Sequence, residues 1–134
     1  MKRPILPDVS VVTPTYKSGA WVEKTLESVV SQTYPHEKIE IVVVDDASPD
    51  DTVRIVRSFL RMQSIRSRVI MQDENAGLAS PGVGLIRNVG WRMARGEWIQ
   101  FLDSDDLLAP HKIALQAGCA SRVPRCANKL PMTH

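Results

Sequence analysis

Hydrophobic positions along the chain follow two spacings, one typical of buried strands and one typical of amphipathic helices. Short β-branched or aromatic runs predict four strands, at 9–13, 39–44, 68–72 and 98–102. Between and after them, apolar residues at helical spacing predict helices over about 20–32, 50–62 and 80–95, with a further short helix after Pro110. Alternating strands and helices predict a parallel sheet with right-handed crossovers, and we expect the strand order 3-2-1-4.

Proline and glycine refine this pattern at two places. Pro14 lacks a backbone donor and disfavours helix at Thr13, so the first strand should end at Thr13. Gly82, Gly84 and Gly90 each cost a helix interior up to about 1 kcal/mol relative to alanine, which predicts close approach of that helix to another backbone or side chain. The predicted fold class is α/β, a three-layer α/β/α sandwich with a Rossmann-like, mainly parallel sheet that is incomplete at the C-terminus.

Length and charge predict one folded domain followed by a different kind of segment. The chain has 134 residues and 43% hydrophobic residues, which suits a single globular domain. All 15 acidic residues lie at or before Asp106, while four basic residues follow it. We therefore expect a domain over 1–117 and an irregular basic tail over 118–134.

The remaining composition argues for an intracellular chain without structural metal. Cys119 and Cys126 have no zinc-type spacing to the histidines, so free thiols in a reducing compartment are expected. No apolar run approaches the roughly 20 residues of a membrane span, and the first residues do not resemble a signal peptide. A cytoplasmic location is the simplest expectation.

Carboxylates gather where the predicted strands end. Asp103, Asp105 and Asp106 directly follow the fourth strand, and Asp45 and Asp46 follow the second. In a doubly wound sheet these carboxyl ends share one edge, together with residues 14–16 and 73–75, and ligands bind there. Crowded carboxylates favour a hard divalent ion, Mg²⁺ or Mn²⁺, although acidic loops more commonly cap turns or face solvent.

Other ligand classes fit the sequence less well. The pair Gly82 and Gly84 lacks the third glycine of a dinucleotide-binding fingerprint, and no Gly-Lys-Ser or Gly-Lys-Thr phosphate loop occurs. Arginines 54, 57 and 61 share one helix face, but without interleaved aromatic residues a solvated face is favoured over a nucleic-acid site. No nucleic-acid partner is expected.

Four motifs occur together in a recognisable order. They are Ser10-Val-Val-Thr-Pro-Thr-Tyr16, Val44-Asp-Asp-Ala-Ser48, Arg87-Asn-x-Gly90 and Leu102-Asp-Ser-Asp-Asp106. As a set, over about residues 8–116, they resemble the nucleotide-sugar-binding half of the family 2 glycosyltransferases, which have the GT-A fold. The resemblance implies transfer of a sugar from a nucleoside diphosphate, with UDP favoured, assisted by Mg²⁺ or Mn²⁺.

The resemblance also implies residue roles. Tyr16 would pack beside the nucleobase, and Asp46 or its neighbour Asp45 would accept a hydrogen bond from it. The expected donor site comprises Pro14, Tyr16, Asp45, Asp46, Arg87 and Asp103. Asp105 is the expected direct metal ligand of the Asp-x-Asp motif, with Asp103 nearby and Asp106 in support.

One departure from the family changes the expected activity. In that family a second half supplies the acceptor pocket and a carboxylate base, whereas nothing acidic follows Asp106 here. We expect a truncated chain that binds donor but is inactive alone, with His111 the one spare base. One alternative is a non-catalytic binding or regulatory fragment that pairs with a full-length enzyme through an exposed sheet edge, an edge that would also allow self-association. The other is a phosphorelay receiver domain, which the Thr-Pro-Thr-Tyr ending of the first strand disfavours.

Overall fold

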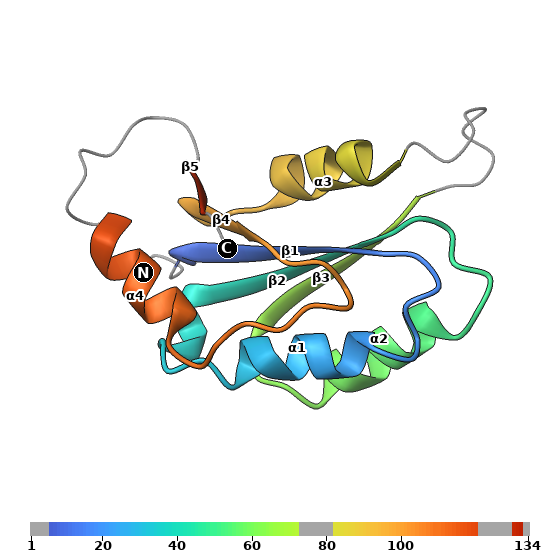
Figure 1. Ribbon diagram of the computed structural model, residues 1–134, viewed down its shortest axis with the longest axis horizontal. Helices are drawn as coiled ribbons and strands as arrows, with labels where there is room; N and C mark the ends of the chain where they lie inside the picture. The colour runs from blue at the N-terminus through green and yellow to red at the C-terminus, as the bar shows by residue number, and fades with distance from the viewer. Residues whose placement is uncertain (1–5, 73–81, 121–129, 133–134) are drawn as a thin grey trace, which may run out of the picture.

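The computed structural model describes residues 6–72, 82–120 and 130–132, and in it one parallel sheet organises the chain (Figure 1). The sheet order is β3-β2-β1-β4-β5, and every neighbouring pair is parallel. The strands are β1 (Val9–Thr15), β2 (Ile39–Asp45), β3 (Arg66–Met71), β4 (Trp98–Phe101) and β5 (Leu130–Met132). The helices are α1 (Val22–Val30), α2 (Thr52–Arg61), α3 (Gly82–Met93) and α4 (Lys112–Ala120), with a short 3₁₀ turn, η1 (His36–Lys38), before β2.

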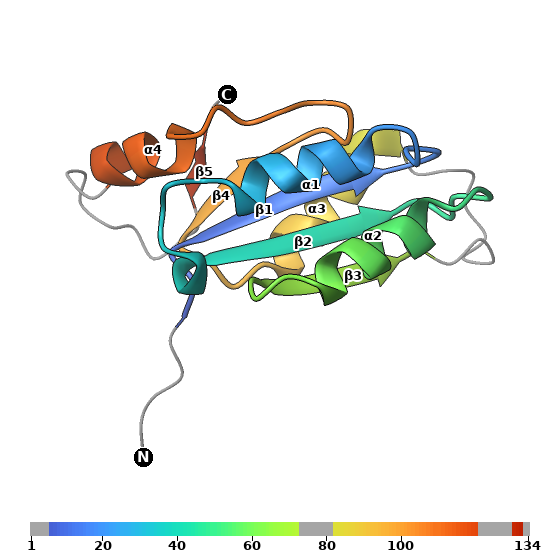
Figure 2. The same ribbon diagram turned by 90° about the horizontal axis from the view of Figure 1, so that it is seen from below.

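Helices cover both faces of the sheet. Figure 1 shows α3 on one face and α1 and α2 on the other, and the rotated view in Figure 2 places α1 and α2 side by side in front of β1 and β2. No helix in the part of the chain that the structure describes is long and apolar enough to cross a membrane. The layers are those of a three-layer α/β/α sandwich, so the predicted fold class is confirmed.

The core divides into two parts because strand residues alternate between the two faces. Val9 and Val11 of β1 pack in the cluster under α1 and α2, whereas Val12 packs with Ile86 in the cluster under α3. All seven residues of β2 are buried, as expected for a central parallel strand covered on both sides. The continuous β-branched run that predicted this strand reflects that double coverage.

The predicted order of the first four strands is confirmed, and a fifth strand adds to it. Val9 pairs with Trp98 and Val12 with Phe101, so β4 lies directly beside β1. The fifth strand, β5, was not predicted and lies inside the stretch expected to be irregular. It has three residues, one of them Pro131, and a run that short carries no detectable period.

The first strand is longer than the sequence predicts. It runs through Pro14 to Thr15 instead of ending at Thr13, because the missing N–H of Pro14 lies beyond the paired part of β4 and so interrupts no bond within that ladder. Leu102 N donates to Val12 O, at 2.9 Å, so residue 12 faces β4. Residues alternate in a parallel ladder, so Pro14 faces the same side, beyond the last paired residue of β4.

Close approach of α3 to the sheet accounts for one of its glycines. A Cβ added at Gly90 would lie 2.3 Å from Val12 Cγ1 and 3.2 Å from Val44 Cγ2, closer than side chains can pack. Val12 and Val44 are fully buried and have no space to retreat. The predicted backbone contact is therefore confirmed at Gly90, and it sets the distance between α3 and the β1–β2 surface.

This contact predicts opposite effects of the same substitution in two helices. Gly90→Ala should lower the free energy of unfolding by about 1–3 kcal/mol, because overpacking outweighs the gain in helix propensity. Gly118→Ala, in α4 with nothing within 4 Å of the added Cβ, should raise it by about 0.5–1 kcal/mol. Urea unfolding of both variants measures the difference, and equal stabilisation by both would contradict the packing at Gly90.

Candidate nucleotide-sugar site

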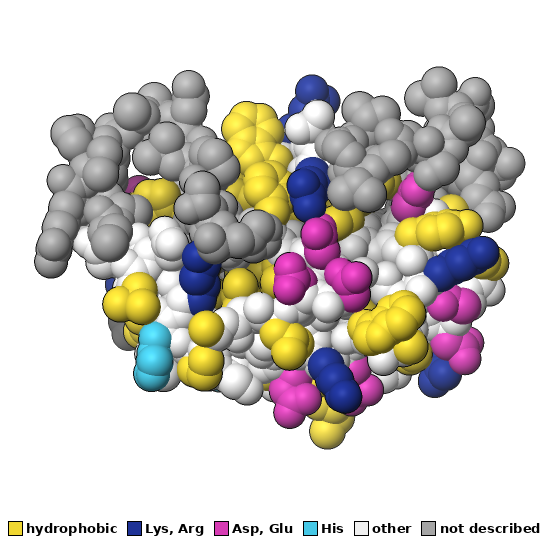
Figure 3. All heavy atoms as spheres, viewed as in Figure 1, with side chains coloured by type: hydrophobic (Ala, Val, Ile, Leu, Met, Phe, Trp, Pro, Cys, Tyr) yellow, Lys and Arg dark blue, Asp and Glu magenta, His cyan; other side chains and the backbone are white. Residues whose placement is uncertain are grey.

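A cleft of about 310 Å³ opens at the carboxyl edge of the sheet, where the loops after β1, β2 and β4 meet the start of α3. On the face shown in Figure 3, acidic side chains gather near the middle with basic and hydrophobic side chains around them. The lining residues are Pro14, Thr15, Tyr16, Lys17, Ser18, Trp21, Asp46, Ile86, Arg87, Asp103, Ser104 and Asp105. The predicted gathering of the acidic loops is thus present for residues 14–16, 46 and 103–105, while residues 73–75 lie outside the described residues.

The loops after β1 and β2 support each other on one side of the cleft. Lys17 and Ala47 both have positive φ, 50° and 55°, a conformation uncommon for residues with a side chain. Lys17 N donates to Ser48 Oγ at 3.0 Å, and Asp46 N donates to Thr15 O at 2.9 Å. These contacts hold two strained turns together, and such strain persists only where the surroundings determine the conformation.

The adjacent carboxylates at the end of β2 have different environments. Asp45 is fully buried and accepts hydrogen bonds from Thr15 Oγ1 at 2.7 Å and from Ser48 N and Oγ at 2.8 and 2.7 Å. Asp46 is half-buried and lines the cleft. Of the two candidates for contact with a ligand, Asp46 therefore lies at the cleft, and Asp45 shapes the loop behind it.

Helix α1 holds the acidic loop that follows β4. Ser104 Oγ lies 2.6 Å from Ser18 Oγ, and Ser104 O accepts a hydrogen bond from Thr25 Oγ1 at 2.7 Å. Ser18 and Thr25 are both buried and Ser104 is half-buried, so these contacts are partly shielded from water. Because Ser104 stands between Asp103 and Asp105, fixing it also fixes the positions from which those two carboxylates project.

The three acidic residues of this loop are placed differently. Asp103 forms an ion pair with Arg87, with 2.6 Å between Oδ1 and Nη2, and the Arg87 guanidinium carbon lies 5.7 Å from the centre of the Phe101 ring. Asp105 is exposed and lines the cleft. Asp106 is exposed and does not line the cleft, and its Oδ1 accepts a hydrogen bond from Leu107 N at 3.2 Å.

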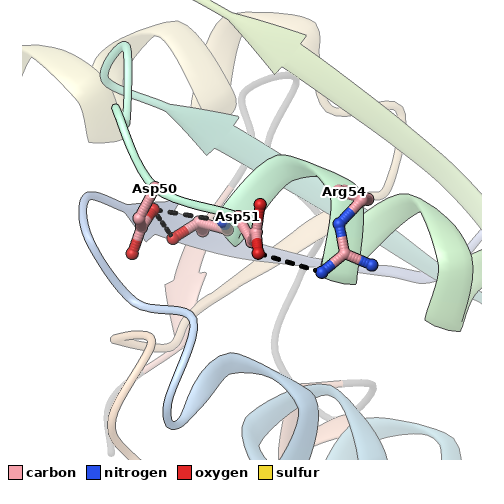
Figure 4. Close-up of polar contacts among 4 residues, drawn as sticks. Asp50, Asp51 and Arg54 are labelled. Atoms are coloured by element: carbon pink, nitrogen blue, oxygen red, sulfur yellow. Dashed lines mark hydrogen bonds and ion pairs between the residues drawn. The ribbon is translucent and has the colours of Figure 1, made fainter.

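The start of α2 supports the β1–α1 loop from behind (Figure 4). Thr52 Oγ1 accepts a hydrogen bond from Ser18 N at 2.9 Å and donates one to Asp50. The bond from the Thr52 hydroxyl holds the pKa of the Asp50 carboxyl below its ordinary value, while Asp51 raises the pKa of the exposed Arg54 through a hydrogen bond and ion pair. Asp50 and Asp51 therefore order the helix start and lie outside the cleft lining.

Several lining residues were not singled out by their sequence pattern. Lys17, Ser18 and Trp21 belong to the cleft although none stands in a charged or periodic pattern, and Ser104 stands in the acidic motif but was given no role. The sequence feature that could have indicated Trp21 is its position directly before the first apolar residue of α1, at the start of that helix. His111, the spare base candidate, is exposed, lies 3.0 Å through Nδ1 from Thr33 Oγ1, and does not line the cleft.

The carboxylates of Asp103 and Asp105 suit a divalent ion that is also coordinated by a bound phosphate ligand. In the described residues no group of three or more His, Cys, Asp or Glu side chains is arranged to enclose a metal. Asp103 and Asp105 do lie together in the cleft, and Mg²⁺ binds proteins through one or two carboxylates plus substrate phosphates and water. The residues present match that mode, with Asp103 currently paired to Arg87.

The known proteins to which the chain is similar include several glycosyltransferases. The chain is 37% identical over 99 residues to the poly(ribitol-phosphate) beta-N-acetylglucosaminyltransferase TarS of Staphylococcus aureus, covering 74% of this chain and 16% of TarS. It is 37% identical over 105 residues to the glycosyltransferase GlyG of Streptococcus pneumoniae, covering 78% of this chain and 32% of GlyG. This chain therefore spans less than half of either relative.

Solved structures and a family model agree with these relatives. TarS residues 1–349 in complex with UDP superpose with a TM-score of 0.76 at 33% identity, over 86% of this chain and 32% of that one. A mannosyltransferase from Pyrobaculum calidifontis in complex with GDP-Man and Mn²⁺ gives a TM-score of 0.72 at 31% identity, over 87% and 32% of the two chains. The model of glycosyl transferase family 2 matches residues 10–122. With this match, the motifs and the cleft, the chain belongs to glycosyl transferase family 2 and has the GT-A fold.

Proposed function

We propose that the cleft binds a nucleoside diphosphate sugar, most favourably a UDP-sugar, together with Mg²⁺ or Mn²⁺, as the donor for sugar transfer. The observation that carries the proposal is the placement of Asp103, Asp105 and Arg87 in one cleft with Tyr16 and Asp46. Support comes from two similar proteins whose structures contain UDP and GDP-Man with Mn²⁺.

The nucleobase fits the side of the cleft built by the loops after β1 and β2. Tyr16 is a half-exposed aromatic side chain there, with Lys17 Nζ 5.5 Å from the centre of its ring. Asp46 offers a carboxylate that can accept a hydrogen bond from a base N–H. A ring surface beside one polar acceptor is the combination that binds and orients a planar heterocycle.

The diphosphate fits the opposite side, beside the acidic loop. The cleft is lined by three carboxylates, of Asp46, Asp103 and Asp105, and by two cations, of Lys17 and Arg87, so it has no excess of positive charge for an anionic ligand. A divalent ion on Asp103 and Asp105 would supply that charge and would stabilise the diphosphate as it leaves the sugar. Arg87 would contribute a fixed cation next to the same oxygens.

The chain's own residues then have separable tasks. Ser18 and Thr25 hold Ser104, so that Asp103 and Asp105 keep their separation before any ligand arrives. Asp45 holds the turn from which Asp46 projects. Such preorganisation lowers the cost of ordering side chains on binding, which favours affinity.

The metal proposal predicts unequal effects at two neighbouring aspartates. With Mn²⁺ present, Asp105→Asn should weaken UDP binding by at least about tenfold, because a ligand carboxylate next to the diphosphate is lost. Asp106→Asn, outside the cleft, should change it by less than about threefold and serves as the matched control. Calorimetric titration with UDP, with Mn²⁺ and with EDTA, measures both.

Two results would contradict this assignment. Binding of UDP that is unchanged by EDTA would remove the metal from the proposal, and equal losses in the two variants would remove Asp105 as its ligand. A well-folded chain that binds no nucleotide in either condition would overturn the donor site itself.

We also expect the 134-residue chain to bind donor without transferring sugar to an acceptor. A hydroxyl nucleophile needs a base, whose loss removes a factor of about 10² to 10⁴, and the cleft carboxylates are engaged with ligand, Arg87 or metal in this proposal. An assay with radiolabelled nucleotide sugars and simple acceptors measures transfer directly. Acceptor-dependent transfer that disappears in His111→Ala would contradict the expectation, whereas slow hydrolysis of the donor agrees with it.

A further inference from the structure

Trp21 lines the cleft, but the sequence pattern did not single it out and the proposed donor site assigns it no role. Its side chain is 56% exposed, more than that of the other exposed tryptophan in the described residues, Trp91, at 37%. A large aromatic surface left in water is unfavourable until something covers it. Trp21 keeps that surface at the cleft lining, beside polar and charged side chains.

The position of Trp21 is fixed by backbone contacts at the start of α1. Trp21 N donates to Ser18 O at 3.0 Å, and Thr25 N donates to Trp21 O at 3.2 Å. Residues four apart lie on the same helix face, and Thr25 is the residue that binds Ser104 O. Trp21 therefore lies on the side of α1 that meets the acidic loop, one turn before that contact.

The β1–α1 loop thus presents its two exposed aromatic side chains to different parts of the cleft. The Tyr16 and Lys17 portion is joined to residues 46–48, through the Asp46 N to Thr15 O and Lys17 N to Ser48 Oγ bonds. Ser18, three residues before Trp21, contacts Ser104 and also bonds the backbone of Tyr16, so it lies between that portion and Trp21. A nucleotide with its base at Tyr16 and its diphosphate at Asp103 and Asp105 would place the next group of the ligand toward Trp21.

We propose that Trp21 is a specificity-determining residue whose indole stacks on the hexopyranosyl ring of the bound nucleotide sugar. A pyranose ring has an apolar face of C–H groups and a polar rim of hydroxyls, which suits an indole that is flat, apolar and carries one N–H donor. Ser104 and Asp105, which line the same cleft, supply acceptors for the rim. This inference rests on the proposed donor function and adds to it the residue that recognises the sugar.

The test compares a ligand without the sugar, UDP, and one with it, UDP-N-acetylglucosamine, by calorimetric titration with Mn²⁺, and each variant is compared with the wild type for the same ligand. Trp21→Ala should weaken binding of UDP-N-acetylglucosamine by about fivefold while changing UDP binding by less than about twofold. Trp21→Phe, which keeps a ring, should restore most of the difference. Trp91→Ala, an exposed tryptophan outside the cleft lining, is the matched control and should change neither affinity.

The other possible results distinguish a wrong sugar assignment for Trp21 from a wrong donor site. Equal losses for both ligands in Trp21→Ala, with an unchanged thermal midpoint, would place the indole on the nucleotide and overturn the sugar assignment alone. Unchanged affinities for both ligands would show that Trp21 touches neither, and would also overturn it. A wild-type chain that binds neither ligand would overturn the donor site and this inference together.

Discussion

The hydrogen bonds of Ser104 to Ser18 in the β1–α1 loop and to Thr25 in α1 are the contacts on which the cleft depends. They join the loop that follows β4 to the segment that follows β1, although the residues involved lie 86 and 79 positions apart in the chain. Parallel strands bring these loops to one edge, but strand pairing alone does not set the distance between them. The Ser18–Ser104 and Thr25–Ser104 contacts set it, and the placement of Asp103, Asp105 and Trp21 follows.

The ion pair between Arg87 and Asp103 gives the cleft an internal balance of charge before a ligand enters. Arg87 comes from α3, whose close approach to the sheet is permitted by Gly90. Its Nη2 pairs with Asp103, while its Nε is buried and makes no hydrogen bond within the described part of the chain. The packing of a helix against Val12 and the chemistry of the cleft are therefore parts of one arrangement.

Much of the architecture could be predicted because the spacing of hydrophobic residues distinguishes strands from helices. Right-handed connections between parallel strands then leave few possible topologies. The β-branched run at 39–44 is typical of a doubly covered strand, and in a parallel sheet the acidic residues after it share an edge with those after β4. Finer features depend on contacts that no local pattern encodes. Asp45 and Asp46 are adjacent and chemically identical, and only the direction in which each side chain projects separates the buried one from the one at the cleft. Ser104 is an ordinary loop serine until α1 is beside it, and β5 is too short to show a period.

Pro14 affects the pairing of β1 with its neighbour β4 at the edge of the sheet that carries the cleft. The next rung of the β1–β4 ladder would need a donor at position 14 for the carbonyl of Leu102, and proline has none. The paired part of β1 and β4 ends at Val12 and Phe101, and the bond from Leu102 N to Val12 O is the last one between them. Beyond this point the end of β1 carries Pro14 and the segment after β4 carries Asp103, and both residues line the cleft. The absence of a single backbone N–H thus marks the end of the β1–β4 ladder and the beginning of the cleft.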